Sequence, residues 1–333
     1  MKVLVTGAAG FIGYHLCKAL IETGASVLGI DCINDYYDVN LKYARLADLG
    51  IVIDNATGTY LLRSDKYPEF KFSRTDITDF DVLRDIWSEY CPDIVVNLAA
   101  QPGVRYSLEN PRAYIKANID GFLNILECCR NNPVRHFVYA SSSSVYGDNA
   151  KVPFDEDDEV KDQASIYAVT KRTDELMAMV YHKLYNIHST GLRFFTVYGP
   201  WGRPDMAPML FAKAIIEGRP IKVFNHGNLS RDFTYIDDII GGILKVIGRE
   251  PGKPTVYNIG HGSPVNLMDF ISTIETNLDK VAQKEFTEMQ PGDVHTTYAS
   301  VDKLRKDFGY EAPTALDKGI KEFISWFKEY YKA

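Results

Sequence analysis

Three side chains in the middle of the chain have the types and spacing of an acid–base set. Tyr167 and Lys171 are four residues apart, so in a helix they lie on the same face. An ammonium beside a phenol favours the phenolate, which is a base usable near neutral pH. Ser142 follows an expected strand, at the end where open α/β sheets bind ligands. We therefore predict that Ser142, Tyr167 and Lys171 are catalytic.

A glycine-rich turn near the N-terminus has the form of a dinucleotide-binding site. Gly7, Gly10 and Gly13 follow an apolar run and begin an expected helix. Glycines permit the tight turn, let backbone N–H groups approach a pyrophosphate, and allow close helix packing. Asp31 ends the next expected strand, where a carboxylate accepts hydrogen bonds from the adenosine ribose and repels a 2′-phosphate. The pattern predicts NAD rather than NADP.

Later strand ends add candidates beside the same cofactor. Asp76 and Ile77 follow the third expected strand and are candidates to flank the adenine, while small residues end the fourth. The full predicted cofactor-binding set is Gly7, Gly10, Phe11, Ile12, Gly13, Asp31, Asp76, Ile77, Leu98, Ala99, Ala100, Gln101, Asn118, Tyr167 and Lys171.

Short β-branched runs alternate with helix-length amphipathic segments from residue 1 to about 195. This alternation is typical of an α/β protein with a Rossmann-like, doubly wound parallel sheet covered on both faces. We expect helices over about 11–23, 39–49, 80–90, 111–130 and 167–185. The expected strands are Lys2–Thr6, Ser26–Asp31, Phe70–Thr75, Ile94–Leu98, Phe137–Ser141 and Ser189–Arg193.

Beyond about residue 195 the pattern becomes irregular, with clusters of Pro and Gly before an aromatic-rich final helix near 315–331. We expect two domains. Residues 1–195 bind NAD, with later segments near 230–260 rejoining them, and residues 196–333 form mainly a smaller, C-terminal substrate-binding lobe.

Two polar stretches interrupt the pattern. The stretch 35–67 is long for a connection in a compact domain, so we expect it to be functional or to carry its own helix. The acidic run 155–159 is expected to be a solvated surface loop.

Composition excludes several classes of protein. The 333 residues are 46% hydrophobic and 24% charged, as in globular proteins, and the net charge of −7 repels nucleic acid and anionic lipid. The five cysteines and seven histidines show no metal-ligand spacing, and no apolar run has membrane-spanning length. We expect reduced cysteines, no metal, no nucleic-acid or membrane partner, and a cytoplasmic location.

Together these motifs resemble the extended short-chain dehydrogenase/reductase family, in particular its nucleotide-sugar epimerases, dehydratases and decarboxylases. The resemblance covers nearly the whole chain and includes Asn97-Leu98-Ala99-Ala100, Leu192-Arg193-Phe194-Phe195 and Arg231-Asp232-Phe233. It implies that Tyr167 removes the proton of a sugar 4-hydroxyl, that Ser142 hydrogen-bonds the same oxygen, and that Lys171 holds the nicotinamide ribose. Hydride then passes from C4 to NAD.

The two residues after the serine narrow the reaction. In the 4,6-dehydratases an Asp-Glu pair stands there, and the UDP-glucuronate decarboxylases have Glu at the second position, whereas this chain has Ser143 and Ser144. The resemblance therefore favours return of the hydride to the other face, which is 4-epimerisation without net redox change. The alternatives are a UDP-galactose 4-epimerase, a UDP-glucuronate decarboxylase, and an NAD-sensing regulatory protein without catalysis.

The segments 35–39, 101–107 and 193–207 resemble UDP-glucuronate 4-epimerases more than UDP-galactose 4-epimerases, which have Asn where Thr196 stands. A glucuronate carboxylate needs a cation or several donors. Because a 4-keto glucuronate is a β-keto acid, we expect Arg203 and Thr196 to hold that carboxylate out of line with the carbonyl π system, which suppresses loss of CO₂.

The family pattern also supplies contacts for the UDP group. It places Arg231 on the diphosphate, Asp293 near the diphosphate or ribose, and the backbone of Val223 and Phe224 at the uracil. The full predicted substrate-binding set is Arg105, Ser142, Ser143, Ser144, Thr196, Arg203, Val223, Phe224, Arg231 and Asp293.

The helices expected over about 111–130 and 167–185 are long, and each must bury more than one face. With the family resemblance, this predicts a homodimer joined by four helices.

Overall fold

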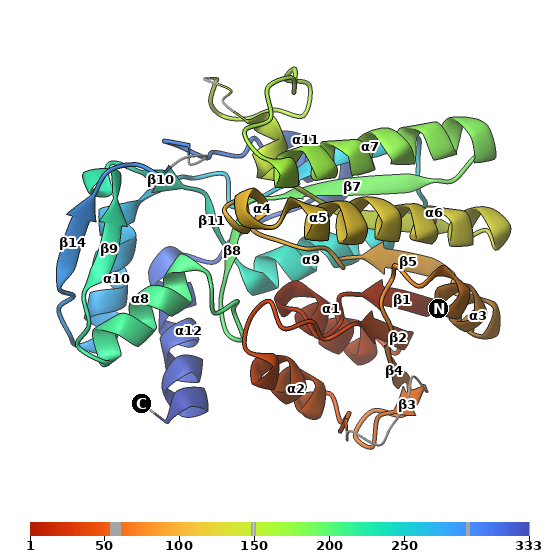
Figure 1. Ribbon diagram of the computed structural model, residues 1–333, viewed down its shortest axis with the longest axis horizontal. Helices are drawn as coiled ribbons and strands as arrows, with labels where there is room; N and C mark the ends of the chain where they lie inside the picture. Colours follow the sequence, from red (N-terminus) through yellow and green to blue (C-terminus); the bar gives the residue numbers. More distant parts are fainter. Residues whose placement is uncertain (54–60, 148, 150, 291–293, 333) are drawn as a thin grey trace. The chain divides into compact units, whose positions relative to one another are not determined.

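The computed structural model describes residues 1–53, 61–147, 149, 151–290 and 294–332. The chain forms two compact units. The first consists of Met1–Val145, Gln163–Arg193 and Ile243–Tyr257, and the second of Tyr146–Asp162, Phe194–Gly242 and Asn258–Ala333. Each unit therefore joins segments that are far apart in the sequence (Figure 1).

The first unit is built on an eight-stranded sheet with the order β12-β7-β6-β5-β1-β2-β4-β3. Neighbours from β4 to β6 pair in parallel, and β3 adds an antiparallel edge. The order reverses at β1, because β2 and β4 lie on one side of it and β5 and β6 on the other. The strands are β1 (Lys2–Thr6), β2 (Ser26–Asp31), β3 (Leu62–Arg63), β4 (Phe70–Arg74), β5 (Ile94–Asn97), β6 (His136–Ser142), β7 (Ser189–Phe194) and β12 (Thr255–Ile259).

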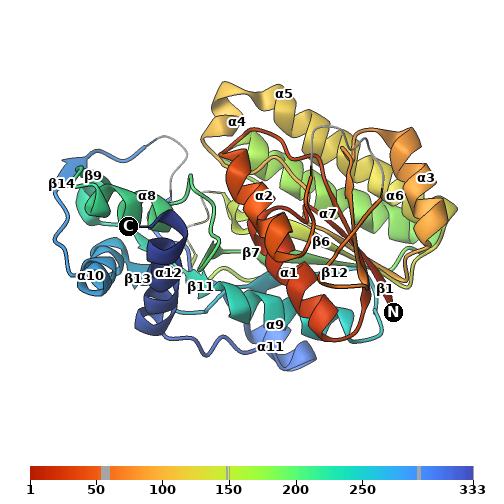
Figure 2. The same cartoon turned by 90° about the horizontal axis from the view of Figure 1, so that it is seen from below.

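Helices cover both faces of this sheet, which confirms the predicted fold class. Figure 2 shows α3 (Phe80–Tyr90), α6 (Gly121–Asn131) and α7 (Ile166–Tyr185) along one face and α1 (Phe11–Glu22) on the other. The core between the sheet and α3, α6 and α7 is apolar. Every second residue of a strand points to that face, and these residues are hydrophobic. Its buried members include Leu4, Leu28, Trp87, Val95, Phe122, Ile125, Leu126, Phe137 and Ala178.

The helix expected over about 111–130 is present, and its middle part is π-helical. The structure has α4 (Tyr106–Glu109), α5 (Pro111–Tyr114) and a π-helical segment, η1 (Ile115–Asp120), before α6. Asn118 in η1 is buried, and its side chain pairs with the backbone N–H and C=O of Gln101 and donates to Thr170 Oγ1. These distant partners hold Asn118 inward, which a sequence pattern does not reveal.

The second unit is more regular than its sequence suggested. Its three short strand pairs are β8 with β11, β9 with β14, and β10 with β13. Strands of two to four residues are too short to give a periodic signal, so the irregular sequence pattern did not indicate them. The strands are β8 (Thr196–Tyr198), β9 (Ile221–Phe224), β10 (Ser230–Arg231), β11 (Phe233–Tyr235), β13 (Val265–Asn266) and β14 (Lys284–Thr287). The helices are α8 (Ala207–Ile216), α9 (Ile236–Ile247, continuing into the first unit), α10 (Leu267–Leu278), α11 (Asp302–Phe308) and α12 (Leu316–Tyr331).

The acidic run 155–159 is only partly solvated, contrary to expectation. Glu156 is buried, and its Oε1 accepts a hydrogen bond of 2.7 Å from the backbone N–H of Asn258. Sequence could not indicate this contact, because the two residues are about a hundred positions apart. In the part of the chain that the structure describes, no helix has the length and apolar character needed to cross a bilayer.

Candidate active site

The glycine-rich turn lies at the switch point of the sheet, between β1 and β5. Gly7 has φ of +71°, and a Cβ on it would lie 2.9 Å from the backbone N of Ala99. A Cβ on Gly13 would lie 2.0 Å from the carbonyl oxygen of Gly7, so α1 can pack on the turn only with glycine there. No side chain caps the N-terminus of α1 at Gly10. This arrangement fits a pyrophosphate at the start of the helix.

Asp31 joins the end of β2 to this turn. Its Oδ2 accepts a hydrogen bond of 3.1 Å from the N–H of Ala9, and its Oδ1 accepts one of 2.7 Å from the N–H of Ile33. A carboxylate oxygen has a second lone pair, so Asp31 can fix the turn and still accept from a ribose hydroxyl.

Two buried cations beside this turn were missed by the sequence analysis. Lys42 and Arg45 lie in α2 (Val39–Asp48), where a helix was expected. The ammonium of Lys42 donates at 2.7 Å to both side-chain and backbone oxygens of Asn34, and Arg45 Nη1 donates at 2.9 Å to the carbonyl of Ala9. Burial lowers the pKa of Lys42, and the charge of Asp31 opposes this shift. Their spacing of three residues is evident in the sequence, but only the fold places Arg45 at the turn and Lys42 at the loop after β2.

The other cofactor candidates end neighbouring strands of the same unit. Leu98–Ala100 are half-buried directly after β5, next to Gly7. After β4, Ile77 is buried, whereas Asp76 is exposed and its Oδ1 accepts from the N–H of Thr78 at 2.9 Å. The turn, Asp31 and these strand ends are thus brought together at one edge of the sheet.

Four consecutive serines, Ser141–Ser144, end β6 and begin a 3-10 turn, η2 (Ser143–Tyr146). Ser142 Oγ accepts hydrogen bonds from the backbone N–H of Ser144 at 3.2 Å and from its hydroxyl at 2.9 Å. A serine that accepts two such bonds directs its own proton elsewhere. Ser142 is therefore oriented as a hydrogen-bond donor to a ligand oxygen.

Tyr167 lies in the first turn of α7, whose N-terminus is capped by Ser165. The side chain of Ser165 accepts a hydrogen bond of 3.1 Å from the N–H of Ala168. The ring of Tyr167 is half-buried and meets Tyr114 of α5 edge to face, with 6.0 Å between centroids. Tyr114 is held in turn, because its hydroxyl donates to the carbonyl of Pro102 at 2.8 Å.

Lys171 is buried one turn further along α7. Its ammonium donates to the carbonyl of Ala140 in β6 at 3.0 Å and to Oδ2 of Asp174 at 3.1 Å. Because Ala140 is two residues before Ser142 in the same strand, β6 positions both the lysine and the serine. The role of Asp174 was not anticipated from the sequence.

A second buried carboxylate, that of Glu175, links α7 to the sheet by hydrogen bonds. Glu175 receives hydrogen bonds from Arg193 of β7 at 2.8 and 2.9 Å and from the hydroxyl of Ser141 in β6 at 2.7 Å. Burial acts to raise the pKa of Glu175, but these bonds and the charge of Arg193 outweigh it and hold the pKa below its usual value. The network fixes the helix against β6 and β7.

Most predicted substrate contacts belong to the second unit. Thr196 is half-buried in β8 and donates its backbone N–H to the carbonyl of Asp232 at 3.1 Å. Arg231 Nη1 donates to the carbonyls of Ser230 at 2.9 Å and His295 at 3.1 Å. The guanidinium of Arg231 is thus held in place by backbone oxygens.

Arg203 is engaged with a neighbouring carboxylate. Its Nε lies 3.1 Å from Oδ1 of Asp205, and its Nη2 lies 2.5 Å from Oδ2, which is the two-point geometry of an arginine with a carboxylate. This geometry is the one that a carboxylate ligand would use. Of the remaining substrate candidates, Val223 is buried and Phe224 half-buried in β9, Arg105 is exposed before α4, and Asp293 lies outside the described residues.

A glycine turn at the strand switch point, with a carboxylate at the end of β2 and Ser, Tyr and Lys on β6 and α7, is the arrangement of the short-chain dehydrogenase/reductase class. Residues 3–260 match the NAD dependent epimerase/dehydratase family, and the chain belongs to this family.

Relatives match over the full length of the chain. It is 47% identical to Protein CapI of Staphylococcus aureus, with all of both chains covered. It is 43% identical to UDP-glucuronate 4-epimerase 4 of Arabidopsis thaliana, which covers 99% of this chain and 76% of the plant protein. Its fold matches the crystal structure of UDP-glucuronic acid 4-epimerase from Bacillus cereus in complex with UDP-glucuronic acid and NAD (TM-score 0.89, 35% identity, 99% and 100% coverage).

These matches confirm the predicted family and enzyme class. The protein is an epimerase, which is an isomerase, and its cofactor is NAD.

Proposed function

We propose that this protein converts UDP-glucuronate to UDP-galacturonate by inverting C4 through a transient 4-keto sugar. The observation that carries the proposal is the serine triplet 142–144, which offers hydroxyls where dehydratases and decarboxylases of the family carry carboxyls. The full-length likeness to proteins named UDP-glucuronate 4-epimerase supports the same substrate.

In the proposed mechanism, Tyr167 acts as a phenolate and takes the proton of the sugar 4-hydroxyl. Ser142 donates a hydrogen bond to the same oxygen, because its own lone pairs receive Ser144. NAD would supply the hydride acceptor and donor for C4, and the glycine turn, Asp31 and Lys171 would hold it. Inversion would require the keto sugar to present its opposite face to the cofactor. Tyr167 gives its proton back to the oxygen, so atoms and electrons balance with no net oxidation.

We propose that Arg203 and Thr196 bind the sugar carboxylate, together with the hydroxyls of Ser143 and Ser144. A fixed carboxylate cannot align its C–C bond with the C4 carbonyl, so CO₂ is retained. Asp205 now occupies the two-point face of Arg203, so the substrate carboxylate would compete with it for the guanidinium.

For the UDP group, the proposed contacts are Arg231 to the diphosphate, the backbone of Val223 and Phe224 to the uracil, and Asp293 near the ribose. Arg231 is the strongest of these, because an arginine fork suits phosphate oxygens and two backbone carbonyls already orient it. Arg105, exposed directly before α4, is a further proposed substrate contact.

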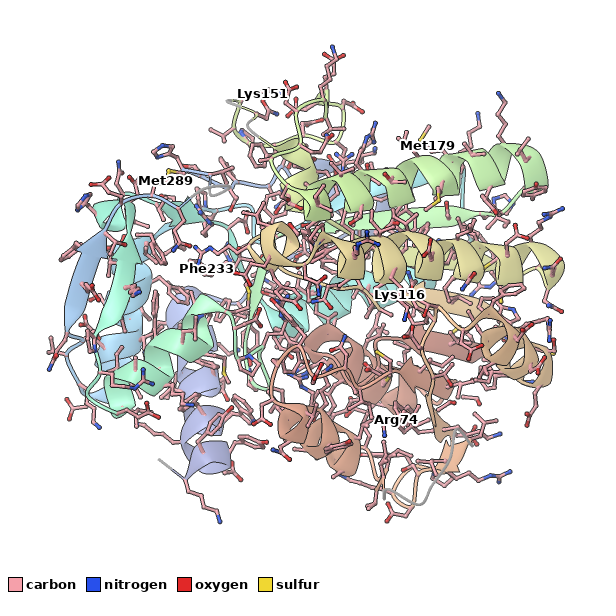
Figure 3. The ribbon with its side chains drawn as sticks, in the orientation of Figure 1. Arg74, Lys116, Lys151, Met179, Phe233 and Met289 are labelled. Carbon is pink, nitrogen blue, oxygen red and sulfur yellow. The ribbon has the colours of Figure 1, made fainter. Side chains whose placement is uncertain are left out.

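We infer that the protein is a homodimer joined through α6 and α7. Apolar side chains that are unusually exposed gather along these helices, and Met179 of α7, labelled in Figure 3, is 56% exposed. Such a stripe is typical of a protein interface. Its other members are Leu123, Ile166, Val169, Leu176, Val180 and Leu184.

The five free thiols favour a reducing compartment, which agrees with a cytoplasmic location.

The deciding experiment incubates the purified protein with UDP-glucuronate, without added reductant, and follows the products by NMR and mass spectrometry. We expect UDP-galacturonate of unchanged mass. A pentose product with released CO₂ would overturn the proposed reaction. Turnover of UDP-glucose or UDP-galactose but not of UDP-glucuronate would overturn the assignment of the carboxylate site.

A further inference from the structure

We propose that Asp174 is a positioning residue of the active site. Its carboxylate fixes the ammonium of Lys171, and its charge state sets the net electrostatic effect of the Lys171–Asp174 pair on Tyr167. The inference rests on the catalytic roles proposed above for Tyr167 and Lys171. It concerns a carboxylate that the proposed mechanism does not otherwise use.

The geometry of the pair is that of a buried anchor. Oδ2 of Asp174 lies 3.1 Å from Nζ of Lys171, and the two side chains are 0% and 3% exposed. The second acceptor of the ammonium is the carbonyl of Ala140 at 3.0 Å. Two acceptors from different elements define one position for Nζ. Water screens a buried pair only weakly, so the charge state of this pair affects the ionisation of neighbouring groups.

The other carboxylate oxygen of Asp174 points to a function beyond packing. Oδ1 is buried and accepts no hydrogen bond from any residue that the structure describes. A buried acceptor without a partner costs stability, so such groups call for an explanation. The neighbouring Glu175, by contrast, has both oxygens satisfied by Ser141, Arg172 and Arg193. Glu175 has the ordinary features of a structural carboxylate, and Asp174 does not.

The charged and titratable groups near Asp174 come from several elements. On α7 these are Lys171 and Glu175, and Glu175 is neutralised by Arg193 of β7. Tyr139 of β6 is buried close enough for Asp174 to raise its pKa further. On the helices packed against α7, Tyr114 lies beside Tyr167, and Glu127 of α6 accepts from Tyr181 three turns beyond the site.

Asp174 is placed to change charge near neutral pH. Burial raises its pKa to about 7, Lys171 opposes this rise, and Glu175 adds to it. Above that pH the Lys171–Asp174 pair is neutral overall, and below it the lysine charge is uncompensated. An uncompensated ammonium stabilises the phenolate of Tyr167, so protonation of Asp174 counteracts the loss of base on acidification.

The size of the effect follows from the helix geometry. Tyr167 and Asp174 are seven residues apart, which is about 10 Å along an α-helix. With an effective dielectric constant of about 20, one charge at that distance shifts an ionisation by about one pH unit.

The test compares Asp174→Asn, Asp174→Leu and the wild type in pH profiles of kcat/KM, with the bound NAD measured for each. Asparagine keeps an oxygen acceptor for Lys171 but removes the charge, whereas leucine removes both. Asp85→Asn is the matched control, because it removes one negative charge from the exposed surface of α3.

We expect Asp174→Asn to retain NAD, to move the acid-side midpoint of kcat/KM down by up to about one pH unit, and to steepen that limb. Asp174→Leu is expected to lower NAD affinity and to reduce kcat at least tenfold at every pH. Asp85→Asn should match the wild type. If the profile of Asp174→Asn superimposes on that of the wild type, or if both variants lower activity equally with an unchanged profile, Asp174 is structural and the proposal is wrong.

The outcome is separable from that of the proposed function. If the wild type does not convert UDP-glucuronate, the substrate assignment fails, and the same profiles are recorded with the UDP-sugar that it does convert. Should Asp174→Asn fail to fold, as judged by circular dichroism, the profile of Asp174→Leu decides. An acid limb unchanged in position and shape would then overturn the inference.

Discussion

Ser142 and Tyr167 are proposed to act on the same substrate oxygen, Ser142 as a hydrogen-bond donor and Tyr167 as a base. Ser142 is oriented by two hydrogen bonds from Ser144, and Tyr167 is held by the first turn of a capped helix and by the ring of Tyr114. Both therefore meet a ligand with little reorganisation, which is the main structural condition for efficient proton transfer.

Tyr167→Phe tests the base directly. We expect kcat to fall by about 10²- to 10⁴-fold with bound NAD retained, because only the proton acceptor is lost. The matched control is Tyr114→Phe, which removes a hydroxyl from the neighbouring ring and should change kcat less than about tenfold. Steady-state kinetics and the NAD content of the purified variants measure both effects. Equal losses in the two variants would contradict the assignment.

Arg203→Ala tests recognition of the sugar carboxylate. Because a charge-assisted hydrogen bond is worth about 1.5–3 kcal/mol, KM for UDP-glucuronate should rise roughly 10- to 100-fold, and a decarboxylated product should appear by mass spectrometry. In the control Asp205→Asn, the competing carboxylate charge is removed from Arg203, and KM should fall or stay the same. Unchanged turnover and product in Arg203→Ala would show that the carboxylate binds elsewhere.

At the scale of elements, α7 has three roles on three faces. Its first turns carry Tyr167 and Lys171, its sheet-facing side is bonded through Glu175 to β6 and β7, and its outer side is apolar and exposed. A helix that is apolar on an exposed side as well as on its core side is explained if a partner covers it.

The homodimer prediction is tested on that outer side. Met179 and Leu184 are 56% and 61% exposed, and replacing both by Glu should place charges in the proposed interface and yield monomers. Size-exclusion chromatography with light scattering measures the mass. Val281→Glu, at a site 85% exposed in the second unit, is the control and should leave the mass unchanged. A wild-type monomer, or a double variant that remains a dimer, would contradict the prediction.

At the scale of the whole molecule, cofactor binding is coupled to stability. The glycine turn and Asp31, which we propose as NAD contacts, come from separate segments of the first unit that folding brings together. A ligand that binds only the folded state stabilises it by mass action.

NAD should therefore raise the unfolding temperature of protein from which the cofactor has been removed. At about 100 times Kd the stabilisation is about 2.7 kcal/mol, which corresponds to several degrees in differential scanning fluorimetry. NADP at the same concentration is the control, and its shift should be smaller because the Asp31 carboxylate repels a 2′-phosphate. Equal shifts with the two cofactors would show that Asp31 does not select between them.

The sequence by itself determined the features that depend on local geometry. The bounds of β1, β2, α1, α2 and α3 lie within one or two residues of those predicted. The spacing of hydrophobic residues and the turn residues at each end are local properties, so the sequence alone shows them. The tight turn at Gly7 was predictable for the same reason, since its positive φ and close packing restrict which residues fit.

Only the tertiary structure decided the contacts between distant segments. Asn118 lies in the π-helical part of an expected helix and bonds Gln101 and Thr170, Glu156 accepts from the N–H of Asn258, and Lys42 donates to Asn34 in the loop after β2. Asp174 sits three residues after Lys171, yet its complete burial depends on how α7 packs on the sheet. Burial and charge pairing are set by what surrounds a side chain, and that environment is assembled from parts of the chain that no local pattern connects.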